Sequence, residues 1–195
     1  MPQYDKIRQA SNSISPITDD DWQYFKPALY TKKISKNDYF LKAGETERAI
    51  GFINKGSCRW FYINKKGDEV NYHFFLDNEF VVEYGSFLTQ QASNQYIQAM
   101  EDSEVVLLPH HDQIIEIYSK SHAWADFGRK IAEKVYLETA ERLKDFLFRD
   151  AEERYLQLLK QRPDIFQRVS LSNIASYLGI QPPSLSRLRR RLSKE

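Results

Sequence analysis

The chain has 195 residues, which is enough for one ordinary domain and a smaller second one. Its hydrophobic content of 42% and its 12 Tyr, 12 Phe and 3 Trp exclude an intrinsically disordered protein. The formal net charge of +1 hides an uneven distribution, because the segment from Arg154 to Glu195 holds nine Lys/Arg and two Asp/Glu. The C-terminal end is therefore suited to a polyanion, whereas the rest of the chain is acidic.

The cysteine content and the hydropathy indicate where the protein works. Cys58 is the single cysteine, so the sequence offers no intrachain disulfide and favours a reducing compartment. No run approaches the ~20 apolar residues of a membrane span, and the first residues show no signal-peptide pattern. We therefore expect a cytoplasmic protein without a membrane partner.

Residues 1–13 are polar, and we expect them to be mobile. A helix is predicted to begin after Thr18, because this residue is a good N-cap and the carboxylates at 19–21 favour the positive end of a helix. Trp22 and Phe25 are predicted to form the buried face of that helix.

Short apolar runs broken by turn residues fill the region from Lys32 to Leu108. Many short strands at a spacing of roughly ten residues are typical of a β-sandwich or a small barrel. We therefore predict a β domain over residues 15–120. The predicted strands include residues 51–53, 58–63, 70–75 and 104–108, and the turns lie at 42–45, 54–56, 66–68 and 77–79.

Beyond Pro109 the apolar spacing is helical. A long helix is predicted over residues 121–149, followed by a shorter one over 151–161. A helix this long needs a partner along its length, which a second copy of the chain would supply; packing against its own β domain is the alternative. Its apolar positions are Trp124, Phe127, Ile131, Val135, Leu143, Phe146 and Leu147.

The remaining segment, within residues 150–195, is predicted to end in two short helices joined by a tight turn. Gly179 follows the first of them, where a chain leaving a helix often needs a left-handed residue. This pattern is typical of a helix-turn-helix domain, whose second helix enters the DNA major groove. The two apolar stripes are Leu171, Ile174, Ala175 and Leu178 in the first helix, and Leu185, Leu188 and Leu192 in the second.

The second helix is predicted to have its first turn at Pro183, because this residue disfavours helical geometry at Pro182. Ser184 and Arg187 lie opposite the leucines, and we expect them to face base edges, since arginine can bond guanine bidentately. A solvated amphipathic helix with a basic end is the simpler alternative. The residues expected to neutralise phosphate are Arg189, Arg190, Arg191 and Lys194.

A β domain, a long helix and a terminal helix-turn-helix, in that order, resemble the Crp/Fnr superfamily of bacterial transcriptional regulators. Gly44-Glu45, residues 54–57 and Gly67 resemble turns of its cyclic-nucleotide-binding domain, and residues 80–87 stand where that family places its phosphate-binding cassette. The resemblance implies an α+β fold with an N-terminal β jelly-roll, a homodimer and transcriptional control. It also implies a small-molecule effector and makes RNA polymerase a candidate partner.

The cassette departs from the pattern of members that bind cyclic AMP, which use a glycine and a glutamate, then an arginine and a small hydroxyl residue. Val82 replaces the glycine and Glu83 is kept. Gapless spacing puts Ser93 at the arginine position and Asn94 at the next one, and no Lys or Arg lies between residues 77 and 112. Since burying a phosphate without a cation is costly, we expect this degenerate effector pocket not to bind cyclic AMP or cyclic GMP.

The C-terminal end departs from the family as well. Pro182 and Pro183 occupy the positions where many members carry an Arg-Glu pair, and the chain stops just after Lys194, so we expect no β-hairpin wing. This short tail is similar to that of Bacteroidetes-type members.

Two alternatives to a DNA-binding regulator remain open. One is a ligand-sensing module whose helix pair has no DNA-binding output. The other is a small enzyme of the cupin type, but such enzymes need clustered metal-binding histidines, and we expect neither enzyme activity nor a cofactor or metal. A single cysteine cannot hold an iron–sulfur cluster, and the histidines lack ligand spacing. These histidines are His73, His110, His111 and His122.

Overall fold

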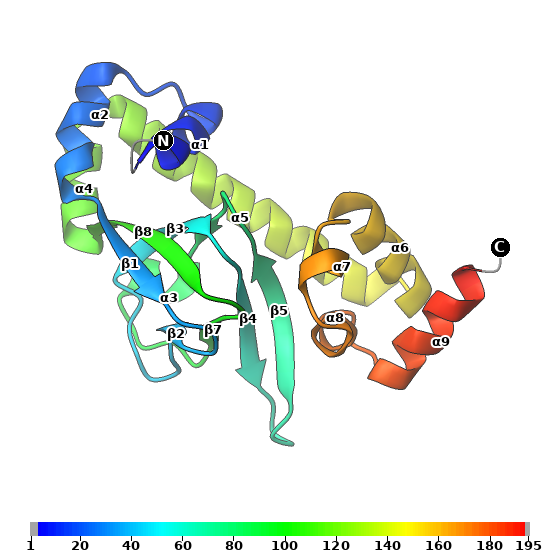
Figure 1. Cartoon of the computed structure of the whole chain (residues 1–195). Coiled ribbons are helices and arrows are strands. Elements are labelled where there is room, and N and C mark those ends of the chain that lie inside the picture. Colours follow the sequence, from blue (N-terminus) through cyan, green and yellow to red (C-terminus); the bar gives the residue numbers. More distant parts are fainter. Residues whose placement is uncertain (1–3, 194–195) are drawn as a thin grey trace. The chain divides into compact units, whose positions relative to one another are not determined.

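The computed structural model describes residues 4–193, and its contacts divide the chain into two compact units. The first unit comprises Met1–Arg59 and Phe75–Leu137, and the second comprises Trp60–Phe74 and Glu138–Glu195. Antiparallel strands dominate the N-terminal part of the chain and helices the C-terminal part (Figure 1). The expected mixture of helices and strands is therefore confirmed.

The strands form two four-stranded sheets, in the orders β1-β8-β3-β6 and β2-β7-β4-β5. In the first sheet Phe52 of β3 lies opposite Val106 of β8 and opposite Phe80 of β6, and Phe52 and Val106 are fully buried. All four predicted strands are confirmed. The strands are β1 (Tyr30–Ile34), β2 (Tyr39–Leu41), β3 (Ala49–Lys55), β4 (Cys58–Ile63), β5 (Glu69–Phe75), β6 (Phe80–Val81), β7 (Tyr96–Ala99) and β8 (Ser103–His110).

The N-terminal residues form helix α1 (Asp5–Ile14), so the expected mobility is wrong for the described residues 4–13. Ile7 is buried in the core of the first unit, and the hydroxyl of Tyr4 donates to the carbonyl of Leu29 at 3.1 Å. The hydroxyl of Ser15, just after the helix, donates to Asp126 at 2.6 Å. The apolar face is narrow, which is why the polar composition concealed the helix.

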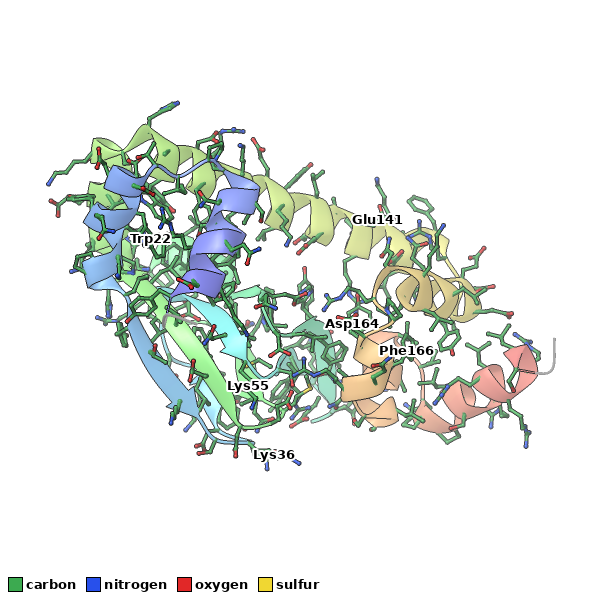
Figure 2. The ribbon with its side chains drawn as sticks, turned by 45° about the horizontal axis from the view of Figure 1, so that its top comes forward. Trp22, Lys36, Lys55, Glu141, Asp164 and Phe166 are labelled. Carbon is green, nitrogen blue, oxygen red and sulfur yellow. The ribbon has the colours of Figure 1, made fainter. Side chains whose placement is uncertain are left out.

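Helix α2 (Asp19–Phe25) begins where the sequence predicts. The hydroxyl of Thr18 accepts a hydrogen bond from the backbone N–H of Asp21 at 3.1 Å, as an N-cap should. Trp22 and Phe25 are buried, and the ring of Phe25 stacks on Trp124 at a centroid distance of 3.8 Å (Figure 2 labels Trp22).

The remaining helices include the long one that the sequence predicts, which runs without interruption from His122 to Phe148. Its first four turns bury Trp124, Phe127 and Ile131 in the first unit. Leu143 and Leu147, on its later turns, are 60% and 64% exposed. The helices that follow α2 along the chain are η1 (Lys26–Ala28), α3 (Tyr84–Thr89), α4 (His111–Lys120), α5 (His122–Phe148), α6 (Ala151–Gln161), α7 (Ile165–Arg168), α8 (Leu171–Tyr177) and α9 (Pro182–Leu192).

Candidate nucleic-acid interface and effector pocket

Helix α8 is capped by Ser170, whose hydroxyl accepts from the backbone N–H of Asn173 at 3.2 Å. Ile174 and Ala175 are fully buried, as the apolar stripe predicts. Leu171 is 39% exposed, so its predicted burial is wrong. It is the first residue of the helix, one turn before the buried Ile174.

The turn between α8 and α9 requires glycine. Gly179 has a φ of +69°, which confirms the predicted left-handed residue. A Cβ at this position would lie 2.8 Å from the Cε1 atom of Phe146. Two arginines bond the carbonyls that end α8: Arg142 donates to Tyr177 at 2.6 Å and Arg154 donates to Leu178 at 3.0 Å. These bonds satisfy acceptors that a helix end leaves open.

Helix α9 begins at Pro182, one residue earlier than predicted, with Gln181 as its N-cap. Proline suits the first helical position, because its fixed φ is helical and that position needs no N–H donor. Pro182 is therefore helical, although the ring of Pro183 disfavours helical geometry at the residue before it.

The two faces of α9 differ in burial. Leu185 is 0% and Leu188 9% exposed, and Leu192 is half-buried. Of the predicted polar residues, Ser184 is half-buried and the arginines are exposed. Lys194 lies outside the described residues. The exposed arginines are Arg187, Arg189, Arg190 and Arg191.

A surface hollow of about 540 Å³ separates the start of α6 from α9. It brings together Ser184, Arg187 and Arg191, whereas Arg189 and Arg190 are not among its lining residues. Arg187 donates to the hydroxyl of Ser184 at 3.1 Å, one turn back on the same helix. Arg191 forms an ion pair with Glu152 of α6, a contact that no sequence pattern predicts.

Strand β5 contacts α8 within the second unit. The hydroxyl of Ser176 accepts from the backbone N–H of Asn71 at 3.0 Å and donates to the carbonyl of Glu69 at 2.9 Å. The guanidinium carbon of Arg142 lies 3.6 Å from the ring centroid of Tyr177, a cation–π contact. Burial lowers the pKa of Arg142, because desolvation disfavours its charged form.

The expected cassette consists of strand β6 and the short helix α3. Glu83 is the N-cap of α3: its carboxylate accepts from the backbone N–H of Gly85 at 3.0 Å and of Ser86 at 2.9 Å. Val82, where the resemblance leads us to expect a glycine, belongs to the hydrophobic core of the first unit. The retained glutamate is thus bonded to its own helix.

The other two predicted pocket residues lie in the loop before β7. Ser93 is buried, and its hydroxyl accepts from the backbone N–H of Gln95 at 3.0 Å. Its carbonyl accepts from the N–H of Gly44 at 2.7 Å, so Ser93 holds two loops together. Asn94 is exposed. Neither residue carries the positive charge that a buried phosphate would need.

A second carboxyl group, which no sequence pattern indicates, lies beside the cassette. Glu47 is 5% exposed, and its backbone N–H donates to the hydroxyl of Ser86 at 2.9 Å. Burial raises the pKa of Glu47 to about 8, and the neighbouring charge of Glu83 adds to this rise.

Comparison with known proteins agrees with this architecture. Residues 31–120 match the family model of the cyclic nucleotide-binding domain. Three solved structures share the fold across most of the chain, at identities too low to show more than the fold. The matched domain and the shared fold agree with the resemblance to the Crp/Fnr superfamily.

The first of these is FixK2 from Bradyrhizobium japonicum, with a TM-score of 0.70 and 16% identity, covering 85% of each chain. The second is CLP from Xanthomonas campestris, described as a c-di-GMP-responsive global regulator, with a TM-score of 0.68, 16% identity and coverage of 91% of this chain and 92% of that one. A crp/fnr-family structure from Eubacterium rectale has a TM-score of 0.70 and 13% identity, covering 91% and 84%.

No curated protein sequence matches the chain. Within residues 4–193, no helix is long and apolar enough to cross a membrane. The same described residues contain no group of three or more His, Cys, Asp or Glu arranged to hold a metal ion.

Proposed function

We propose that this protein is a dimeric, sequence-specific DNA-binding transcriptional regulator of the Crp/Fnr type. The observation that carries the proposal is the contrast in burial along α9, where Leu185 and Leu188 are buried whereas Arg187, Arg189, Arg190 and Arg191 are exposed. An exposed row of arginines on a helix held by its leucines suits the major groove and its phosphates. In this proposal α8, the Gly179 turn and α9 form a helix-turn-helix.

The proposal divides the chain into three functional parts. Residues 15–120 form a β jelly-roll, residues 121–149 a connecting and dimerisation helix, and residues 150–195 the DNA-binding domain. The division is supported by the match of residues 31–120 to a cyclic nucleotide-binding domain and by the uninterrupted helix α5.

Dimerisation is supported by the exposed stripe of α5. Tyr136, Leu143 and Leu147 are 72%, 60% and 64% exposed, and with Ala140 they alternate at steps of four and three residues. This spacing is typical of the seam between two coiled helices. A symmetric dimer would place its two recognition helices about 34 Å apart, in successive major grooves.

Selection of binding sites from a random duplex pool tests the proposed function directly. We expect the full-length protein to enrich a near-palindromic sequence whose half-sites lie about one helical turn apart. Enrichment of no common sequence at low salt would overturn the proposal and favour a module without DNA-binding output.

The effector pocket is proposed to reject cyclic AMP and cyclic GMP. Glu83 is bonded to the start of α3, Val82 is packed in the core, and Glu47 is a buried carboxyl group beside them. Titration calorimetry should therefore show no binding of either nucleotide at micromolar concentrations. Micromolar or tighter binding would contradict this part of the proposal without affecting the DNA-binding part.

A further inference from the structure

The ion pair between Glu152 and Arg191 crosses the hollow next to the proposed DNA-binding face. It joins residues 39 positions apart, from the first turn of α6 and from the last turn of α9. Their side chains are 37% and 58% exposed, so the pair is reached by solvent and by ions. An arginine in this position cannot give its full hydrogen-bonding capacity to a phosphate while it holds a carboxylate.

The other carboxylates at the start of α6 are engaged differently. Asp150 accepts from the backbone N–H groups of Glu152 and Glu153, both at 2.9 Å, and Glu153 accepts in return from the N–H of Asp150 at 2.9 Å. These bonds form a capping box, which stabilises the helix itself. The side chain of Glu152 takes no part in that box, and its carboxylate pairs with Arg191 of α9 instead.

We propose that Glu152 is a positioning residue that competes with DNA phosphate for Arg191. In the free protein its carboxylate holds the guanidinium across the hollow, and a phosphate of the bound duplex replaces it. When phosphate binds Arg191, the ion pair between Arg191 and Glu152 is broken. Glu152 therefore weakens phosphate binding without contacting the bases. This inference depends on the proposed function, because Glu152 can compete with phosphate for Arg191 only if α9 binds DNA.

A set of four full-length proteins tests the proposal by titration of a fixed duplex: wild type, Glu152→Gln, Arg191→Gln and the double variant. Glu152→Gln should bind roughly two- to fivefold more tightly, the range expected for an exposed ion pair. It should also steepen the dependence of log K on log salt by up to about 0.9, since one more cationic group becomes available to phosphate. The gain should be the same on specific and unrelated duplexes.

The double variant separates competition from the general loss of a negative charge. If Glu152 acts through Arg191, then Glu152→Gln gains nothing when Arg191 is already glutamine. Glu153→Gln is the matched control, because it removes a charge one residue away while glutamine can still serve the capping box. An equal gain in the control, or a gain that persists in the double variant, would overturn the proposal.

The outcome also distinguishes this inference from the proposed function. If wild type binds DNA and Glu152→Gln binds it equally, only the competition is refuted. If none of the four proteins binds any duplex at low salt, the DNA-binding function itself fails, and with it the role of Glu152.

Discussion

Gly179 has a positive φ and lies close to Phe146, and two substitutions separate these requirements. Gly179→Ala should lower the free energy of unfolding by about 1–2 kcal/mol, since a left-handed backbone strains a residue with a Cβ. Gly179→Asn should cost less, because asparagine tolerates this conformation although it also carries a Cβ. Urea titration of both variants measures the difference. Equal losses would mean that the contact with Phe146, and not the backbone, sets the requirement.

Glu47 predicts a dependence of stability on pH. Its pKa is raised by burial to about 8 in the folded protein, against 4.5 for an ordinary glutamate. The folded state therefore binds the proton of Glu47 more tightly than the unfolded state does. The stability that Glu47 contributes is complete below pH 4.5 and is lost as the pH rises through 8. The slope can reach about 1.4 kcal/mol per pH unit.

Substitution of this residue isolates its share of that dependence. Glu47→Gln keeps a similar shape without the charge, so its stability relative to wild type should increase steadily between pH 5 and pH 8 (about the range spanned by the two pKa values). Urea midpoints at several pH values provide the measurement. A constant difference between the two proteins would show that Glu47 ionises normally.

At the level of elements, the sequence predicts well where one face of a strand or helix is apolar. Strands β3 and β8 were found because their buried residues form apolar runs, and α5 because its spacing is helical. Strand β1, Tyr-Thr-Lys-Lys-Ile, was missed, since it is an edge strand with two exposed lysines. Helix α1 was missed because its polar composition hides one narrow apolar face.

The candidate site likewise has features that a local sequence pattern predicts and features that it does not. The leucine stripe and the arginine face of α9 follow from a local pattern, and the structure agrees with both. Arg191 pairs with Glu152, and the buried carboxyl of Glu47 lies near Glu83. In both cases the two residues are distant in the sequence. No periodic pattern connects such positions, so only the folded chain reveals them.

The exposed stripe of α5 predicts the behaviour of that helix. Leu143→Asp should weaken self-association by at least roughly 2 kcal/mol, because a carboxylate would be buried in place of an apolar side chain. Lys144→Asp introduces the same residue one position along, off the stripe, and should have a much smaller effect. Sedimentation at several protein concentrations measures both. A monomeric wild-type protein, or equal effects of the two variants, would contradict a seam along this stripe.

For the whole molecule, the division of charge is the feature that the proposed function explains. Nine Lys/Arg and two Asp/Glu lie between Arg154 and Glu195, although the chain as a whole carries a net charge of +1. Such a molecule can bring its basic end to DNA while the acidic remainder is repelled by it, which favours one orientation of approach. The roles of the arginines within that end can be separated by their effect on sequence preference and on salt dependence.

The most direct test measures the binding of a selected duplex and a scrambled one at several salt concentrations, for wild type, Arg187→Ala and Arg190→Ala. Arg187→Ala should lose roughly 1–3 kcal/mol on the selected duplex and discriminate less between the two. Arg190→Ala should weaken both duplexes alike and reduce the salt slope by about 0.9. If Arg187→Ala binds both duplexes as tightly as wild type does, α9 does not read DNA in the way proposed.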